Sequence, residues 1–299
     1  MLTLGVLVTN YNTWELALEC VRAHRRLHGD RLARIVLLDD ASPQEPPAGV
    51  ADEPGVAVLR NERNLGFSAN LNLGVRAVGA DVVLIFDADA YPLAPYFDRV
   101  AEAFDHDPAL AVLGFRTQDD TGRPTACEHA EPGALGLVLG PSWLVPWQRV
   151  FPERETRRCL PTAAIAVRRA AFDAVGGFDE HLRWLDVDFD FCMKLNRATP
   201  PWTLRVDDAL LARHDYGGTP VSSRARVLRT HEARWYLLRK HGKIAHPRLV
   251  KAAVLARLAL QWVLVATLGR WIFRGGPAVR ADKLASRREL FLYCWRHYA

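Results

Sequence analysis

Short runs of β-branched residues and leucine recur through the first two thirds of the chain, and helix-patterned stretches separate them. Runs this short and apolar, bounded by polar turns, are typical of strands buried on both faces of a sheet. The expected strands are 4–9, 34–38, 56–60, 82–86, 111–114 and 160–167, and the expected helices are 14–28, 68–78, 93–104 and 169–175. This alternation predicts an α/β fold in which helices flank a mostly parallel sheet.

Two stretches break the alternation. Residues 119–158 are rich in Pro, Gly and polar residues and lack periodicity, which predicts a long loop that binds a ligand or covers a site. Residues 216–223 form a second loop, rich in Gly and Ser, and the chain after it is helix-patterned. We therefore expect one α/β domain over 1–240 and a helical C-terminal extension over 241–299.

Composition changes this picture little, but charge adds to it. The 299 residues are 49% hydrophobic and 24% charged, as in an ordinary folded protein. The net charge of +5 comes from Arg-rich stretches near the C-terminus. Such an excess suits nucleic acid, an anionic membrane surface or a nucleotide-diphosphate ligand. The chain shows no helix-turn-helix, zinc-finger or RNP pattern, so we expect no nucleic-acid partner.

Cysteine usage and the N-terminus bear on the compartment. The five cysteines are odd in number and show no Cys-x-x-Cys spacing, which favours a reducing cytosol over a disulfide framework or a zinc site. The N-terminus enters a strand without a basic n-region, so we expect no signal peptide and a cytoplasmic protein.

Two carboxylates, Asp87 and Asp89, follow the apolar strand 82–86. In open α/β sheets, ligands bind at the carboxyl ends of the strands. A pair of acids there suits a hard divalent cation that keeps several waters and binds ligand phosphates. A polar loop tip explains one Asp but explains a pair less well. The sequence therefore predicts a metal–diphosphate site.

Three further acids, Asp186, Asp188 and Asp190, alternate along the chain just before an apolar-periodic stretch, with Trp184 close by. A helix N-terminus favours Asp as a cap and through the macrodipole, which accounts for one or two of them. A carboxylate at a helix start beside apolar side chains can also act as a general base. Capping and catalysis are both open on the residues alone.

Two single residues also have two interpretations each. A lone His such as His214 is more often structural or solvent-exposed, but imidazole is a common metal ligand, and the following Gly217 and Gly218 favour phosphate contact. Asp39 ends the second strand. It either accepts hydrogen bonds from a nucleobase or ribose, or forms an Asx-turn with Ser42.

The order of these pieces resembles glycosyltransferase family 2, the inverting nucleotide-sugar transferases of GT-A fold, and most of all its rhamnosyltransferase-like branch. The segments that carry the resemblance are Val8–Asn12, Leu38–Ser42, Arg63–Asn70, Asp87–Asp89, Gly176–Glu180, Asp188–Leu195 and His214 with its glycines. Together they cover about residues 3–240. Each segment alone is weak, but seven in the family's order make a specific signal.

The resemblance implies a role for each matching position. The donor-binding residues would be Thr9, Tyr11, Asp39, Asn64 and Asp87. The ligands of Mg²⁺ or Mn²⁺ would be Asp89, Asp87 and His214. The acceptor side would be lined by Gly176, Gly177, Phe178 and Trp184. Asp188 would be the catalytic base, and a single displacement would invert the anomeric centre.

One position departs from the family's Glu-Asp motif, because its Glu is Val187 here. The Asp usually credited as the base is retained at Asp188, and Asp186 is the alternative base. The implied reaction moves a sugar from a nucleotide-diphosphate donor to a glycan or lipid-linked acceptor in cell-surface polysaccharide or glycolipid assembly.

Two other functions compete with this one. A sugar-nucleotide pyrophosphorylase would need a Gly-rich loop bearing Arg or Lys after the first strand, where this chain has Thr9–Trp14. A catalytically impaired, membrane-docked scaffold is favoured only by Val187, and the retained acids and histidine argue against it.

The stretch 248–274 is an apolar helix pattern punctuated by basic residues and by Trp262 and Trp271. This pattern suits a helix lying on an anionic membrane surface, on the inner face of the plasma membrane. Its charge-free part, 258–269, is shorter than the about 20 residues of a spanning helix, so we expect no full crossing. Packing against the catalytic domain or a dimer partner is the alternative, and the oligomeric state is open.

Overall fold

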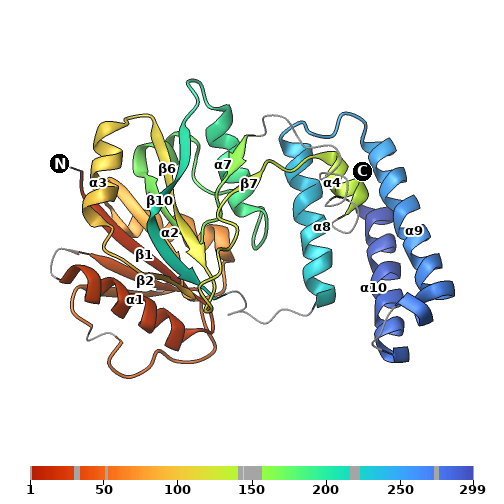
Figure 1. Ribbon diagram of the computed structural model, residues 1–299, viewed down its shortest axis with the longest axis horizontal. Helices are drawn as coiled ribbons and strands as arrows, with labels where there is room; N and C mark the ends of the chain where they lie inside the picture. The colour runs from red at the N-terminus through yellow and green to blue at the C-terminus, as the bar shows by residue number, and fades with distance from the viewer. Residues whose placement is uncertain are drawn as a thin grey trace. The chain divides into compact units, whose positions relative to one another are not determined.

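The computed structural model describes residues 2–29, 34–50, 53–140, 144, 157–215, 223–272 and 276–298. The chain divides into two compact units (Figure 1). Unit 1 comprises Met1–Glu131 and Arg157–Pro220, and unit 2 comprises Pro132–Thr156 and Val221–Ala299.

Unit 1 is built on an eight-stranded sheet of order β3-β2-β1-β4-β9-β6-β10-β5. Its strands are β1 Leu4–Asn10, β2 Ile35–Asp39, β3 Val56–Arg60, β4 Val82–Asp87, β5 Ala90–Pro92, β6 Leu110–Gln118, β9 Ala164–Arg168 and β10 Thr203–His214. Strands β1 to β4 pair in parallel, and so do β6 and β10. β9 lies antiparallel between β4 and β6, which makes the sheet mixed.

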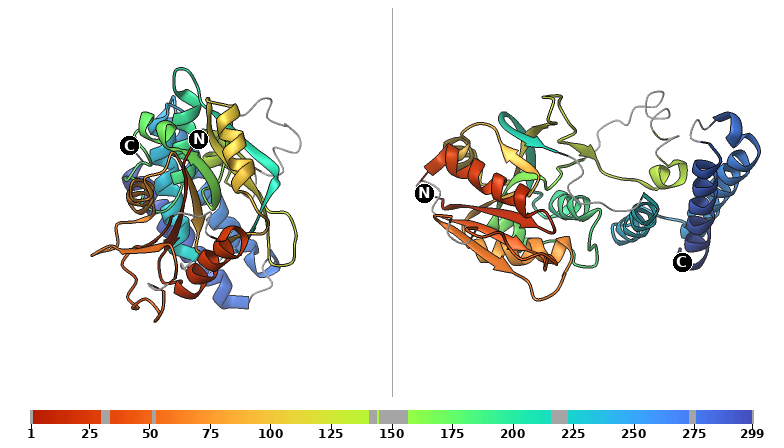
Figure 2. Two further views of the ribbon diagram at one scale, coloured as in Figure 1. Left: turned by 90° about the vertical axis from the view of Figure 1, so that its left-hand side faces the viewer. Right: turned by 90° about the horizontal axis from the view of Figure 1, so that it is seen from below.

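Helices cover both faces of this sheet (Figure 2). They are α1 Trp14–His28, α2 Phe67–Val78, α3 Phe97–His106, α6 Arg169–Ala174 and α7 Val187–Arg197. α1 and α3 pack on one face, where their apolar side chains join those of alternate strand residues in one core cluster. α2 packs on the other face at Gly74, because a Cβ there would come within 2.4 Å of Leu7. The expected α/β fold is confirmed.

Most expected elements lie within two residues of their observed bounds, and three differ by four residues at one end. The strand expected over 111–114 extends to Gln118 as β6. The helix expected from residue 93 begins at Phe97, because Ala90–Pro92 forms β5. The strand expected over 160–167 begins only at Ala164. The sequence pattern does not predict β10. Its residues are often charged and only three of its side chains are buried, so it lacks the apolar run that signals a central strand.

The stretch 119–158 is more structured than a loop. It contains β7 His129–Ala130, which pairs with β8 Arg158–Cys159, and it contains α4 Ala134–Leu139. Much of the remainder of this stretch, and the glycine-rich loop expected at 216–223 up to residue 222, lies outside the described residues.

Unit 2 is helical, with α4 joined by α8 Ser223–Lys240, α9 Pro247–Ile272 and α10 Gly276–His297. Its core cluster includes Leu137, Leu238 and Leu258. Trp235 stacks on Tyr298 with ring centroids 3.9 Å apart. α8 therefore belongs to unit 2 by its packing, whereas the sequence placed the domain boundary after residue 240. The division into a catalytic domain and an extension stays a prediction.

Helix α9 meets the length and composition of a membrane span over Pro247–Gly269, and 22% of that stretch is buried. The sequence argument against a full crossing required a stretch free of charge. Lys251 and Arg257 interrupt the run, and α9 still has the length and the mean hydropathy of a spanning helix. Length and composition alone therefore do not exclude a crossing.

Candidate active site

Three predicted metal ligands meet where strands of unit 1 end. β1 and β4 run in parallel register, with Thr9 opposite Asp87. The chain then turns through Asp89 into β5, which pairs antiparallel with β10 so that His214 lies opposite Ala90. One ligand atom each of Asp87, Asp89 and His214 lies within 4.8 Å of the others, and His214 Nε2 is 3.6 Å from Asp89 Oδ1.

The electrostatics of this cluster favour a bound cation. Burial, followed by the charge of Asp89, raises the pKa of Asp87 to about 6, against smaller opposing effects of His214 and of a 3.4 Å hydrogen bond from Thr9. Burial works against the charged form of His214, but Asp89, whose Oδ1 lies 3.6 Å from Nε2, and the nearby carboxylates of Asp87 and Asp215 leave the pKa of His214 raised. Half-buried carboxylates and an imidazole are a donor set that fits Mg²⁺ or Mn²⁺. Protons and a cation would compete for Asp87 near pH 6.

The three acids at the start of α7 have three different surroundings. Asp186 occupies the N-cap position with a φ of 60° and makes no capping hydrogen bond through its side chain. Asp190 is fully buried, and its carboxylate lies 3.5 Å from Lys194 Nζ. Asp188 is half-buried, and its charge contributes to the raised pKa of Asp87. Asp188 therefore lies close enough to Asp87 for its charge to affect that carboxyl.

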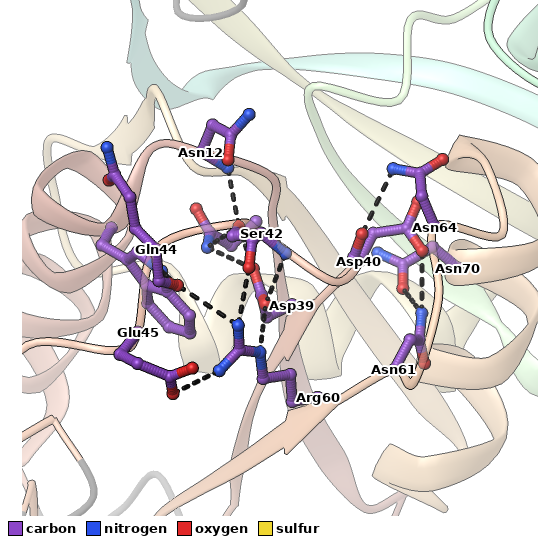
Figure 3. Close-up of polar contacts among 12 residues, drawn as sticks. Asn12, Asp39, Asp40, Ser42, Gln44, Glu45, Arg60, Asn61, Asn64 and Asn70 are labelled. Carbon is purple, nitrogen blue, oxygen red and sulfur yellow. Dashed lines mark hydrogen bonds and ion pairs between the residues drawn. The ribbon is translucent and has the colours of Figure 1, made fainter.

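Asp39 is held by the protein itself (Figure 3). Its carboxylate accepts hydrogen bonds from Asn10 Nδ2 at 2.7 Å and from the Ser42 N–H at 3.0 Å and hydroxyl at 2.5 Å. Arg60 Nε lies 3.3 Å away, and the Asp39 side chain has no exposed surface. The turn with Ser42, one of the two interpretations of this residue, is therefore present. Donor binding by Asp39 stays a prediction.

Asp40, which the sequence did not single out, shapes the neighbouring turn (Figure 3). Its carboxylate accepts hydrogen bonds from Asn61 Nδ2 at 2.9 Å and from the backbone N–H groups of Leu65 at 2.8 Å and Gly66 at 3.0 Å. Its carbonyl accepts one from Asn64 Nδ2 at 3.2 Å. Asp40 thereby fixes the turn that carries Asn64 and leads into α2. Only the doubled Asp at the end of β2 hinted at this role.

The predicted acceptor residues fall into two kinds. Phe178 is buried, with its ring centroid 4.4 Å from that of Phe191, so it packs in the core. Gly176 and Gly177 have positive φ values of 75° and 70°, which L side chains rarely adopt, so both shape the turn. Trp184 is 36% exposed, and the Arg183 guanidinium lies 5.1 Å from its ring centroid. Trp184 and Gly176 are therefore the members of this set that are exposed and could contact a ligand.

Asn72 of α2 anchors that turn, and the sequence did not point to it. Its Nδ2 donates to the carbonyl of Phe178 at 2.9 Å and to Glu180 Oε1 at 3.0 Å, and its Oδ1 accepts from the Phe178 N–H at 2.8 Å. A Cβ on Gly177 would come within 2.6 Å of Asn72 Oδ1. The side chain thus joins α2 to the segment that leads toward α7.

Replacing Asn72 with Ala is expected to lower the free energy of unfolding by about 2–4 kcal/mol, because a buried N–H and a buried C=O of Phe178 lose their partner. Chemical denaturation measures this loss. Leu73→Ala on the same helix is the control, since Leu73 is 41% exposed and should cost little. Equal losses for the two variants would show that Asn72 does not anchor the turn.

Comparison with known proteins identifies the family of the chain. A family model described as Glycosyl transferase family 2 matches residues 5–173. The N-acetylglucosaminyl-diphospho-decaprenol L-rhamnosyltransferase of Mycobacterium tuberculosis is 26% identical over 311 aligned positions, which cover 94% of each chain. The pre-mycofactocin glycosyltransferase of the same organism is 28% identical over 187 positions, covering 61% of this chain and 37% of that one.

Solved structures share the fold at low sequence identity. The mannosyltransferase PcManGT of Pyrobaculum calidifontis, in complex with GDP-Man and Mn²⁺, superposes with a TM-score of 0.54 at 15% identity, covering 99% of this chain and 86% of that one. TarS 1–349 of S. aureus, in complex with UDP-GlcNAc, gives a TM-score of 0.53 at 16% identity, covering 98% and 81%. Because the family match spans more than half of the residues, the chain belongs to glycosyltransferase family 2 and is an enzyme of that family.

Proposed function

We propose that the protein is an inverting, metal-dependent glycosyltransferase that moves a sugar from a nucleotide-diphosphate donor to a hydroxyl of a lipid-linked or glycan acceptor, in cell-surface polysaccharide or glycolipid assembly. The observation that carries the proposal is the meeting of Asp87, Asp89 and His214 at the strand ends, with the charge of Asp188 acting on Asp87. Family membership supports the reaction class.

Each residue has a definite task in this mechanism. Asp87, Asp89 and His214 would hold Mg²⁺ or Mn²⁺, which neutralises charge on a leaving diphosphate when bound. Asp188 takes the proton of the acceptor hydroxyl as that oxygen bonds to the anomeric carbon. The bond from this carbon to the diphosphate oxygen breaks with its electron pair on the opposite face, so one displacement inverts the centre.

The relative that aligns over 94% of both chains is named for an acceptor linked to decaprenol through a diphosphate. This name supports a lipid-linked acceptor here. Such an acceptor is held in a membrane, so the enzyme would have to meet it at the membrane surface.

A panel of UDP, dTDP, GDP and CMP, each with Mn²⁺, Mg²⁺ or a chelator, tests the donor class. One diphosphate with a divalent cation is expected to stabilise the protein by about 2.7 kcal/mol at 100 times its Kd, and to raise Tm by roughly 5–10 °C. CMP serves as the monophosphate comparison. A lack of any metal-dependent shift across the panel would contradict a nucleotide-diphosphate donor and favour the scaffold alternative.

We also propose that α9 contacts a membrane surface. Several large apolar side chains of α9 and α10 are exposed in unit 2, namely Leu249, Leu260, Trp262, Val263, Leu268, Trp271 and Trp295. Tryptophan beside basic residues is typical of helices at an anionic headgroup layer.

Co-sedimentation with phosphatidylcholine vesicles, with and without phosphatidylglycerol, measures this contact. The double change Trp262→Ala and Trp271→Ala should reduce vesicle binding several-fold, because it removes the two exposed indole rings of α9. Leu93→Ala, an exposed apolar position in unit 1, should leave binding unchanged. If vesicle binding persists in the double variant, or if only the oligomeric state changes, the exposed face serves another contact.

A further inference from the structure

The positive charge of the chain is concentrated in unit 2. Residues 221–299 contain 17 Lys and Arg against 3 Asp and Glu, whereas the rest of the chain contains 22 against 31. Two of those three acids, Asp282 and Glu289, lie 2.8 and 3.7 Å from Arg224. The acids of this region therefore leave most of its cationic groups unbalanced.

Two of these cationic side chains, Arg257 of α9 and Arg287 of α10, have guanidinium nitrogen atoms that are buried within unit 2. Arg257 Nη1 donates to Gln261 Oε1 at 3.2 Å, and Arg287 Nη1 donates to the carbonyl of Lys283 at 3.1 Å. Nε and Nη2 of Arg257 and Nε of Arg287 are buried, and no acceptor in the described part of the chain receives them. Each guanidinium thus satisfies only part of its fixed set of donors.

Arg257 has neutral polar neighbours, Cys294 and Tyr298, as well as the cationic Arg287. The Arg257 guanidinium lies against the backbone at Gly140, where a Cβ would come within 2.9 Å of Nη1. Leu290 lies one helical turn beyond Arg287 and is buried in the core of unit 2. Burial lowers the pKa of both guanidinium groups. At Arg257, Cys294 and Tyr298 oppose this lowering of the pKa, and the charge of Arg287 adds a smaller lowering effect. The charge of Arg257 also helps burial lower the pKa of His231 to about 4.

Such an arrangement is costly for a purely structural pair. Like charges with unsatisfied donors in an apolar cluster destabilise a fold unless an anion joins them. The planar guanidinium presents parallel N–H groups that match two oxygens of a phosphate. The two arginines therefore have the chemistry of an anion site.

We propose that Arg257 and Arg287 form a binding site for a phosphate or diphosphate group, separate from the cluster of Asp87, Asp89 and His214. The group comes either from an amphiphile or from a free anion. Exposed Leu260 and Trp262, close to Arg257 along α9, favour the amphiphile. The anion site is argued from residues of unit 2 alone. Only the step that identifies the amphiphile as a lipid-linked acceptor rests on the proposed function.

The test uses the full chain in a chelator, so that no divalent cation holds diphosphate at the acidic cluster. Inorganic diphosphate and farnesyl diphosphate are titrated while thermal unfolding is followed. Both should raise the Tm of the wild-type protein. A larger rise with farnesyl diphosphate assigns the site to an amphiphile, equal rises assign it to the free anion, and no rise with either overturns the proposal.

Variants separate binding from a structural role. Arg257→Met with Arg287→Met should abolish the response while leaving the ligand-free Tm unchanged or higher, because two unpaired buried charges are gone. Arg257→Lys keeps the positive charge but loses the paired N–H groups of the guanidinium, so it should weaken the response. This variant replaces the double Met variant as the test if the latter fails to fold. Arg248→Met removes an exposed charge of the same helix and should change nothing. A retained response in the double Met or Lys variant overturns the proposal.

Failure of this proposal and failure of the donor proposal are distinguishable on the same samples. The metal-dependent nucleotide shift reports on the acidic cluster of unit 1, whereas the diphosphate response in chelator reports on the arginine pair of unit 2. The double Met variant should lose the diphosphate response in chelator and keep the metal-dependent nucleotide shift.

Discussion

Replacing Asp188 with Asn is expected to lower the rate of sugar transfer by about 10²- to 10⁴-fold and to leave nucleotide binding intact, because an amide of the same shape cannot take the proton of the acceptor hydroxyl. The side chain is half-buried in the first turn of α7, and its charge acts on Asp87. Transfer rates under single-turnover conditions, measured beside the nucleotide-dependent Tm shift, separate chemistry from binding.

Two further substitutions make this result specific. Asp186 is the alternative base, because Val187 stands where the family motif has Glu. Asp186→Asn tests this alternative, and it should lower the transfer rate much less than Asp188→Asn does. Asp173→Asn changes an exposed carboxylate paired with Arg169 on α6, and it should leave transfer unchanged. A loss of transfer in Asp186→Asn but not in Asp188→Asn would move the base two residues toward the N-terminus. If both variants still transfer sugar at the wild-type rate, neither Asp186 nor Asp188 is the base that takes the proton.

The α/β core was predictable because its signal is local. Val56–Arg60 was expected at its observed bounds, and β1, β2 and β4 are apolar runs that form strands wherever they lie in the sheet. Asp87 and Asp89 could be placed for the same reason, since the end of a buried parallel strand fixes where they emerge. Elements of this kind require no knowledge of distant partners.

The role of His214 as a metal ligand was expected only from the family resemblance. No local pattern in the chain predicts this role, because the position of His214 depends on a pairing between strands that lie far apart in the sequence. Only three of the twelve residues of β10 are buried and several are charged, and the antiparallel pairing of β10 with β5 brings His214 beside Asp89. The same limit applies to Asn72, whose task exists only once the Phe178 turn lies against α2. Tertiary contact, not propensity, gives such polar residues their roles.

The C-terminal helices show a different limit. A basic residue in an apolar helix pattern indicates a charge facing headgroups or solvent, and that interpretation included Arg257. Its buried Nε and Nη2 atoms show that a long side chain can direct its charged end into a helical cluster instead. The direction of a side chain depends on which faces the neighbouring helices cover, and periodicity along one helix does not report it.

Replacing Asp89 with Asn is expected to abolish the metal-dependent part of nucleotide binding. At a nucleotide concentration of 100 times Kd, this corresponds to the loss of about 2.7 kcal/mol of ligand-induced stabilisation. Asp89 supplies one of the two carboxylates of the cluster, and its oxygen lies 3.6 Å from His214 Nε2. An amide in its place is a much weaker ligand of a hard cation. Thermal unfolding with the preferred nucleotide, in Mn²⁺ and in chelator, measures the change.

The pH dependence of the same shift gives an independent check on the site. In the wild-type protein the metal-dependent shift should weaken as pH falls through about 6, because the raised pKa of Asp87 lets a proton displace the cation there. The charge of Asp89 is the second largest cause of that raised value, so Asp89→Asn should lower the pKa of Asp87. Asp120→Asn, an exposed carboxylate of unit 1, should preserve both the shift and its pH profile. An undiminished Mn²⁺-dependent shift in Asp89→Asn would place the cation elsewhere and separate the acidic cluster from donor binding.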